Sequence, residues 1–340
     1  MNKPVDRFNH HLGAFENKLK EALEAYAGNP IPGLGDHLYN LDARTPLFQL
    51  QGLARIEKKA GKDKDKAEEW LLHAKELEDA IGKYDYWVAM IQNNKRWKFP
   101  ERIERYFKMQ AAQALGVLDE RLLKLGWIEK DYTGAVRFSD EGVKRFRKSL
   151  KKADFHGSCK ERKKLLELYR DEANEIHQKV VNKELDLDHV EFGIHEFRRN
   201  TRWLGIYASA LLGKVRIDQS TGQEALKHFV TPARSSIRHN QLPQNESQED
   251  PLFFLPGGFY AMSDLIAGIG DIKDPGLATE EMMRIGKLFG LTPAAIRKHL
   301  GKDYYPHAKV IKDAKAMIRN YVQKENVFSH IAEHFDKQIK

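Results

Sequence analysis

The sequence predicts an all-α protein, and three observations carry that prediction. Apolar residues recur at intervals of three and four along most of the chain, which is the spacing of one helix face. Alternation of the kind that strands require is confined to a short stretch near residues 127–139. The length of 340 residues is enough for two domains or two repeats of about 150 residues each.

Composition indicates a folded protein with a basic surface. Hydrophobic residues make up 41% of the chain, charged residues 31%, and the formal net charge is +8. That charge favours an acidic partner such as nucleic acid, polyphosphate or a membrane surface; the alternative is plain solubility, because 57 bases against 49 acids is a modest imbalance. Cys159 is the single cysteine, which excludes an internal disulfide and favours a reducing compartment. The N-terminus lacks the apolar core of a signal peptide, and no apolar run approaches the roughly 18 residues of a membrane span, so we expect a cytoplasmic protein that does not enter the membrane.

The first third of the chain predicts three helices. The first runs from about residue 6 to residue 26, where the apolar positions are Phe8, Leu12, Phe15, Leu19, Leu23 and Tyr26. A second is expected from Asp36 past Arg55, with a kink or a late start because Pro46 lies inside it. The third spans residues 66–92.

A strongly basic segment follows at residues 95–108, where lysines and arginines alternate with Trp97, Phe99, Tyr106 and Phe107. Basic residues between aromatics can bind phosphates and stack on bases, but the same pattern is typical of an amphipathic helix with a solvated basic face. The stretch at 127–139 reads as two short strands around a turn. It resembles the wing of a winged-helix DNA-binding domain, but the pattern favours a structural hairpin between two helical units.

The second half predicts further helices. A long helical signal covers residues 142–183, interrupted at His156-Gly157-Ser158, and carries a second basic segment at 144–164. A helix from Asp188 to Val215 comes next, and then a polar loop at 231–250 that is long enough to be mobile or functional. The remaining helices are expected at 259–269, 280–289, 293–300, 307–322 and 326–339.

The helix from Asp188 to Val215 carries a basic stripe. At 3.6 residues per turn, one side of it presents His195, Arg198, Arg199 and Arg202. Acids stand only at the edge of this stripe, so it is typical of a surface that binds an anion. The alternative is a histidine hydrogen-bonded to a neighbouring carbonyl, which is the commoner role for a helical histidine.

The chain also contains a weak internal repeat. His37 is followed by Asn40 and Arg44 with the same spacing that joins His195 to Arg198 and Arg202. A second correspondence relates the run from Gly82 to Asp85 to the run from Gly270 to Asp274. Each of these runs is expected to end or bend its helix.

These residues resemble the CHAD family, the conserved histidine α-helical domain, whose helices carry a histidine followed by arginines and then a glycine-containing turn with a basic residue and an aspartate. His195, Arg198 and Arg202 match the first motif, and Gly270 with Lys273-Asp274 matches the second. In the first half His37 and Arg44 match, whereas Asn40 replaces a base and the turn is one residue short.

The resemblance implies two pseudo-symmetric four-helix bundles whose basic helix faces line a central cleft for inorganic polyphosphate or another polyanion. The corresponding boundaries are a first repeat at 1–125, a hairpin connector at 126–141 and a second repeat at 142–340. The anion-binding residues would be His195, Arg198, Arg199, Arg202, His37, Arg44 and Lys273. Because arginine and lysine bind phosphate oxygens without reading bases, the physical chemistry agrees with this expectation.

Other functions remain open at this point. A nucleic-acid-binding protein would use the segments 95–108 and 144–164 with the hairpin as a wing, and a helical scaffold would bind a protein partner. Neither a nucleophile motif nor a spacing of metal ligands stands out, so we expect no enzyme, no metal and no cofactor.

Overall fold

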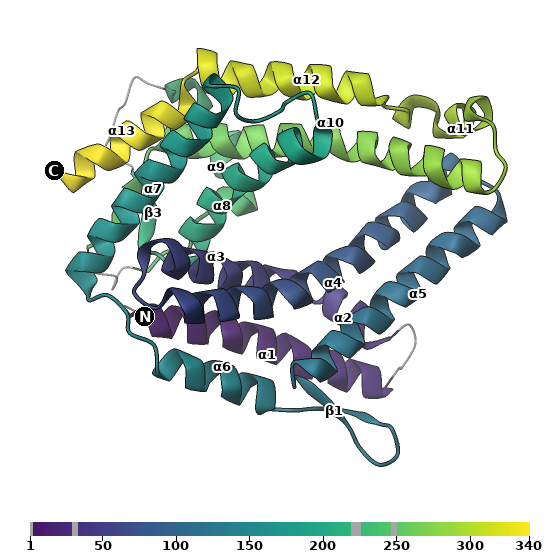
Figure 1. Ribbon diagram of the computed structural model, residues 1–340, viewed down its shortest axis with the longest axis horizontal. Coiled ribbons are helices and arrows are strands. Elements are labelled where there is room, and N and C mark those ends of the chain that lie inside the picture. Colours follow the sequence, from purple (N-terminus) through teal and green to yellow (C-terminus); the bar gives the residue numbers. More distant parts are fainter. Residues whose placement is uncertain (1–2, 29–32, 219–225, 246–249) are drawn as a thin grey trace. The chain divides into compact units, whose positions relative to one another are not determined.

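The computed structural model describes residues 3–28, 33–218, 226–245 and 250–340 (Figure 1). This part of the chain is mostly helical, with two short two-stranded sheets, so the all-α prediction is confirmed. The chain divides into two compact units, Met1–His156 and Gly157–Lys340, which we call unit 1 and unit 2 and describe separately. Among the described helices, none combines the length and the apolar character that crossing a bilayer requires.

Unit 1 is built from helices that follow one another with short connections. Its elements are α1 (Pro4–Gly28), α2 (Leu34–Asn40), α3 (Arg44–Ala60), α4 (Lys64–Trp97), α5 (Glu101–Lys124), β1 (Ile128–Lys130), β2 (Val136–Phe138) and α6 (Glu141–Lys151). The apolar face predicted for α1 is the one that the fold buries: Phe8, Leu12, Phe15 and Leu19 are all fully inaccessible. Helix α3 packs between α1 and α4, and α5 packs on α4.

The second predicted helix is in fact two helices, α2 and α3, separated by a turn in which Asp42 has a positive φ of 55°. Pro46 lies at the third position of α3. The first turn of a helix has no acceptor for a backbone N–H, so proline costs little there. The late start expected from Pro46 is therefore confirmed.

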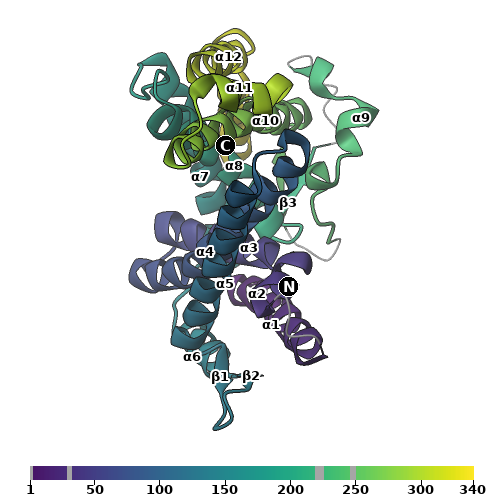
Figure 2. The same ribbon diagram turned by 90° about the vertical axis from the view of Figure 1, so that its right-hand side faces the viewer.

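The hairpin predicted at 127–139 is present in unit 1, where β1 pairs antiparallel with β2 and Ile128 lies opposite Phe138 (Figures 1 and 2). Trp127, just before β1, is buried and donates a hydrogen bond from its indole nitrogen to Nε2 of His73 at 2.7 Å. Helix α1 packs against both β2 and α6. These contacts place the hairpin and residues 142–156 in unit 1, whereas the sequence boundaries separate them from the first repeat.

Unit 2 has more short and irregular elements between its helices than unit 1. Its elements are α7 (Ser158–Val181), the π-helical turn η1 (Val190–His195), α8 (Glu196–Ala210), β3 (Val215–Ile217), α9 (Pro232–Ser235), β4 (Leu252–Phe254), α10 (Pro256–Leu288), α11 (Pro293–Leu300), α12 (His307–Arg319), the π-helical turn η5 (Asn320–Lys324) and α13 (Val327–Ile339). Strands β3 and β4 pair in parallel. The loop predicted at 231–250 contains α9, and its residues 246–249 lie outside the described part of the chain.

Helix α10 corrects two predictions. The helices expected at 259–269 and 280–289 are one continuous helix, with Pro275 inside it. The missing N–H of a proline weakens a helix locally, but α10 packs on α8, α12 and α13, and this burial outweighs the local cost. Neither helix ends at its glycine, because Gly82 and Gly270 lie inside the long helices α4 and α10, so of the two expectations for these positions the helix end is wrong.

The two units repeat one order of packing. In unit 1, α3 contacts α1 and α4, α5 contacts α4, and α2 contacts α4 and α5. In unit 2, α8 contacts α7 and α10, α12 contacts α10, and η1 contacts α10 and α12. The element before α3 in unit 1 and the element before α8 in unit 2 are both short, α2 in one and η1 in the other. Helix α2 ends four residues before Arg44, and η1 ends three residues before Arg198.

Candidate anion site

The basic stripe of unit 2 begins where η1 passes into α8. The turn depends on Gly193, because a Cβ atom at this position would lie 1.8 Å from the carbonyl oxygen of Asp186. His195 ends this turn, and Arg198 and Arg202 follow three and seven residues later on the same face of α8. All three side chains are partly exposed. The sequence prediction that they share one helix face is therefore consistent with the position of α8.

Helix α10 brings a fourth base to this stripe. Lys273 is only 4% exposed, and its ammonium group lies 2.7 Å from Oδ1 of Asp274. Arg198 reaches across to the same helix, where its Nε donates to the carbonyl oxygen of Ile266 at 2.9 Å. Gly270 makes room for this contact, since a Cβ atom there would lie 2.9 Å from Nη2 of Arg198. The arginine thus lies flat on α10 at a glycine.

The imidazole of His195 lies among these bases. Burial lowers its pKa most; the carboxylate of Glu191 opposes this shift, and the charges of Lys273, Arg199 and Arg198 lower the pKa further. Its Nδ1 atom is buried and has no hydrogen-bond partner among the described residues. A buried ring nitrogen without a partner is costly, so this atom is available to a ligand or an ordered water.

Two bases at this stripe, Arg199 and Lys273, form ion pairs with neighbouring acids. Arg199 pairs with Glu196 at 2.5 Å on the outer side of α8, and Lys273 pairs with Asp274. Arg198, by contrast, has no carboxylate within ion-pair distance in the described part of the chain. Its Nε donates a hydrogen bond to a neutral backbone carbonyl. The guanidinium therefore keeps its full charge and most of its donors for an anion.

Arg44 of unit 1 lies on α4 in the same manner but is neutralised there. Its Nε and Nη2 donate to Oε1 of Glu78 at 3.1 and 2.6 Å, and its Nη1 donates to Oδ2 of Asp85 at 2.7 Å. The hydroxyl of Tyr39 donates to the other oxygen of Asp85 at 2.9 Å, and burial together with this bond raises the pKa of Tyr39. The prediction that Arg44 binds an external anion therefore meets two internal carboxylates that already engage this side chain. All three guanidinium nitrogens of Arg44 donate hydrogen bonds to these two carboxylates.

Two arginine contacts define how the units correspond. A Cβ atom at Gly82 would lie 2.8 Å from Nη2 and 3.2 Å from Cζ of Arg44, and one at Gly270 would lie 2.9 Å and 3.4 Å from the same atoms of Arg198. These contacts align Arg44 with Arg198, whereas the sequence repeat aligns it with Arg202. His37 then has no histidine counterpart, and it lies partly exposed in α2.

Sequence analysis missed Glu78, which decides the charge of the unit 1 cluster. It lies four residues before Gly82, and Asp85 lies three residues after it, so both face the arginine from one side of α4. The residues four before and three after Gly270 are Ile266 and Lys273. An acidic pair seven residues apart around a helical glycine is the signal that could have found this cluster.

The segment 95–108 does not offer the aromatic surface that a base-stacking site requires. Trp97 and Phe99 are each 5% exposed and Phe107 is fully buried, so these rings belong to the core of unit 1. Two of its bases are paired along α5, Lys108 with Glu104 at 2.7 Å and Arg105 with Glu101 at 3.8 Å. The segment spans the end of α4 and the start of α5, and its buried rings favour the interpretation of helices with a solvated basic face.

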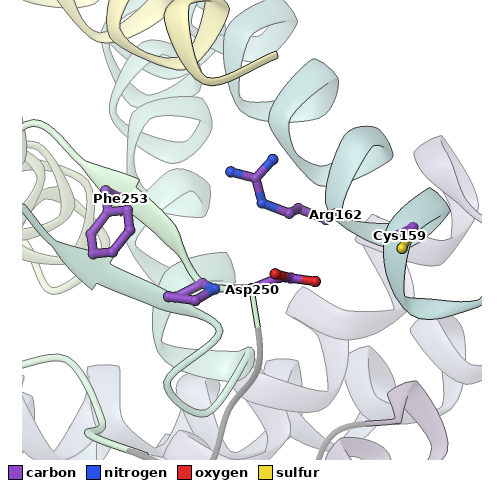
Figure 3. A pocket seen from close by; sticks show the side chains of 5 residues that line it. Cys159, Arg162, Asp250 and Phe253 are labelled. Atoms are coloured by element: carbon purple, nitrogen blue, oxygen red, sulfur yellow. The ribbon is translucent and has the colours of Figure 1, made fainter. Parts of the chain in front are cut away.

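A separate pocket of about 480 Å³ lies in unit 2 between the start of α7 and β4 (Figure 3). Cys159 and Arg162 come from α7, and the facing wall is formed by Asp250, Pro251 and Phe253. The five lining residues include no histidine that could activate the thiol. Within the described ranges, no group of three histidine, cysteine or carboxylate side chains gathers to hold a metal ion.

Comparison with known proteins adds no relative: no protein-family model, curated protein or solved structure matches this chain.

Proposed function

We propose that this protein binds inorganic polyphosphate or a similar phosphate-rich polyanion without catalysing a reaction, and that unit 2 holds the anion. The residues that contact it in this proposal are Arg198, Lys273, Arg202 and His195. The observation that carries it is the unpaired guanidinium of Arg198, which lies on α10 beside a buried lysine and the open ring nitrogen of His195. Phosphate oxygens accept from all of these donors at once.

We further propose that the two units are pseudo-symmetric helical bundles of the CHAD type. The repeated order of packing and the two arginine contacts on glycine support this relation. The cleft that the CHAD resemblance implies would need basic faces from both units. The neutralised Arg44 argues against an equal contribution from unit 1.

The proposal is tested by calorimetric titration of the wild-type chain with inorganic tripolyphosphate and with long-chain polyphosphate at low salt. Arg198→Ala should weaken binding about 10- to 100-fold, because it removes one or more charge-assisted hydrogen bonds. Arg284→Ala is the matched control. Arg284 also belongs to α10 but pairs with Glu281 on the surface at 2.7 Å, so its loss changes the net charge equally without touching the stripe.

Two outcomes would count against the proposal. If Arg198→Ala and Arg284→Ala weaken binding equally, the chain responds to net charge and has no site at α8. If duplex DNA displaces polyphosphate at comparable concentration, the chain is a general nucleic-acid binder instead.

A further inference from the structure

The same arginine-on-glycine contact occurs in both units, but the residues around it carry opposite charges. In unit 1 the guanidinium of Arg44 faces two carboxylates, Glu78 and Asp85. In unit 2 the corresponding positions hold Ile266, which is neutral, and Lys273, which is basic. One cluster is therefore acidic overall, and the other is basic.

We propose that Glu78 and Asp85 act as a built-in ligand that closes the unit 1 cluster, so that the chain has a single anion site, in unit 2, and takes one compact phosphate segment there. This inference rests on the proposed function for the identity of the anion. The inference adds two points to the proposed function: the number of anion sites and the length of the ligand that binds.

The hydrogen bonds of Arg44 show what such a ligand does. One oxygen of Glu78 accepts hydrogen bonds from Nε and Nη2 of Arg44, and one oxygen of Asp85 accepts from Nη1. Phosphate oxygens accept from an arginine in the same way. Glu78 is held in place by its burial, with a side chain only 9% exposed. Asp85 is held by the hydroxyl of Tyr39. An anion that competes for Arg44 must therefore displace two fixed internal carboxylates.

At Arg198 of unit 2 an external anion meets no such competitor among the described residues, although Lys273 is paired with Asp274. Nε of Arg198 donates to the carbonyl oxygen of Ile266, a contact that fixes the side chain on α10 and leaves the two terminal nitrogens. Lys273 lies on the same helix, about two turns after Ile266 and with Gly270 between them, at the position where unit 1 has an acid. The ammonium of Lys273 is buried, so its charge is poorly screened by solvent.

A single site in one unit predicts a short ligand. A polymer held by both units would gain affinity with chain length, because it would engage two clusters at once. With the unit 1 cluster closed, tripolyphosphate should bind the wild-type chain with one site and with nearly the affinity that a long polymer shows per bound segment.

The experiment opens the unit 1 cluster by giving it the residues of unit 2. Glu78→Ile with Asp85→Lys copies Ile266 and Lys273, and Glu78→Gln with Asp85→Asn is a milder version that removes charge and keeps shape. Calorimetric titration with inorganic tripolyphosphate should find one site in the wild-type chain and two in the opened chain. Addition of Arg44→Ala should abolish the second site. If both opened variants fold, as judged by circular dichroism, and neither gains an Arg44-dependent site, the inference is overturned.

A reciprocal variant tests the same point in unit 2. Ile266→Glu places a carboxylate where unit 1 has Glu78, and we expect it to occupy Arg198 and weaken tripolyphosphate binding at least 10-fold. Ile266→Gln has nearly the same shape without the charge and should bind within about twofold of the wild type. Equal binding by the two variants would contradict the inference.

The results separate this inference from the proposed function. If the wild-type chain does not bind tripolyphosphate but an opened variant binds it through Arg44, the proposed function is wrong, and the role of Glu78 and Asp85 as an internal ligand is supported. If the wild-type chain binds at Arg198 but the opened variants gain no second site, the proposed function is supported, and the role of Glu78 and Asp85 as an internal ligand is wrong.

Discussion

Alanine at the two glycines should affect the two units differently, because the arginine above each glycine is held differently. A Cβ atom at Gly82 would come within 2.8 Å of Nη2 of Arg44, and one at Gly270 within 2.9 Å of Nη2 of Arg198, so each guanidinium must move. Inside a helix, alanine is favoured over glycine by about 1 kcal/mol. The net effect depends on what the arginine loses when it moves.

At Gly82 the loss is large. Arg44 is 28% exposed and is bound by two carboxylates, and partly buried charge-assisted hydrogen bonds contribute about 1.5–3 kcal/mol. Subtracting the helix preference, we expect Gly82→Ala to lower the free energy of unfolding by about 0.5–2 kcal/mol. At Gly270 the arginine gives up one bond to a carbonyl and can turn towards solvent, so Gly270→Ala should change stability by less than about 1 kcal/mol.

The assay is urea unfolding at neutral pH, with Gly116→Ala as the control. Gly116 is exposed inside α5, and a Cβ atom there would meet nothing within 4 Å, so this variant measures the helix preference alone. Stability should fall in the order Gly116→Ala, Gly270→Ala, Gly82→Ala. If Gly82→Ala is as stable as Gly116→Ala, Arg44 does not rest on α4 under two carboxylates, and the contrast between the units is lost.

Three further predictions concern single residues. Because an anion stabilises the charged imidazole of His195, whose pKa burial lowers, the ratio of wild-type to His195→Gln affinity for tripolyphosphate should rise as the pH falls below 7, and a flat ratio would exclude His195 from the site. Burial first, and then Arg145, lower the pKa of His73 to about 4, so the folded chain binds fewer protons than the unfolded chain between pH 6.5 and 4. The wild type should therefore lose up to about 3 kcal/mol more than His73→Gln over that range in urea unfolding, whereas equal losses would show that His73 titrates normally. Pro275→Ala restores a backbone donor inside α10 and should raise the free energy of unfolding, measured by thermal unfolding, by about 1 kcal/mol. A lower free energy of unfolding would mean that the packing of α10 requires a bend at this position.

Local pattern was sufficient for the helices of unit 1, because each buries one continuous face. The spacing of Phe8, Leu12, Phe15 and Leu19 predicted α1, and the position of Pro46 predicted where α3 begins. Pattern failed at Pro275 because the tertiary packing of α10 outweighs the local preference of proline to end a helix. Local pattern also could not show that α6 packs on α1, since this contact leaves no mark on either helix alone.

The candidate site was predictable only within one helix. Periodicity placed His195, Arg198 and Arg202 on one face of α8, and the CHAD resemblance supplied Lys273. Periodicity could not show that Arg44 is neutralised, because Glu78 and Asp85 belong to a different helix and lie 34 and 41 residues away. Contacts of that range depend on how two helices cross, which no local pattern encodes.

The most direct test of the unit 2 site is the imidazole resonance of His195, followed by nuclear magnetic resonance while inorganic tripolyphosphate is added to the wild-type chain and assigned with His195→Gln. We expect the His195 signal to move and its pKa to rise with saturation at one anion per chain, while the signal of His37 stays in place. A shift of His37 as large as that of His195, or no shift of His195 at anion concentrations that saturate binding, would contradict a single site on α8.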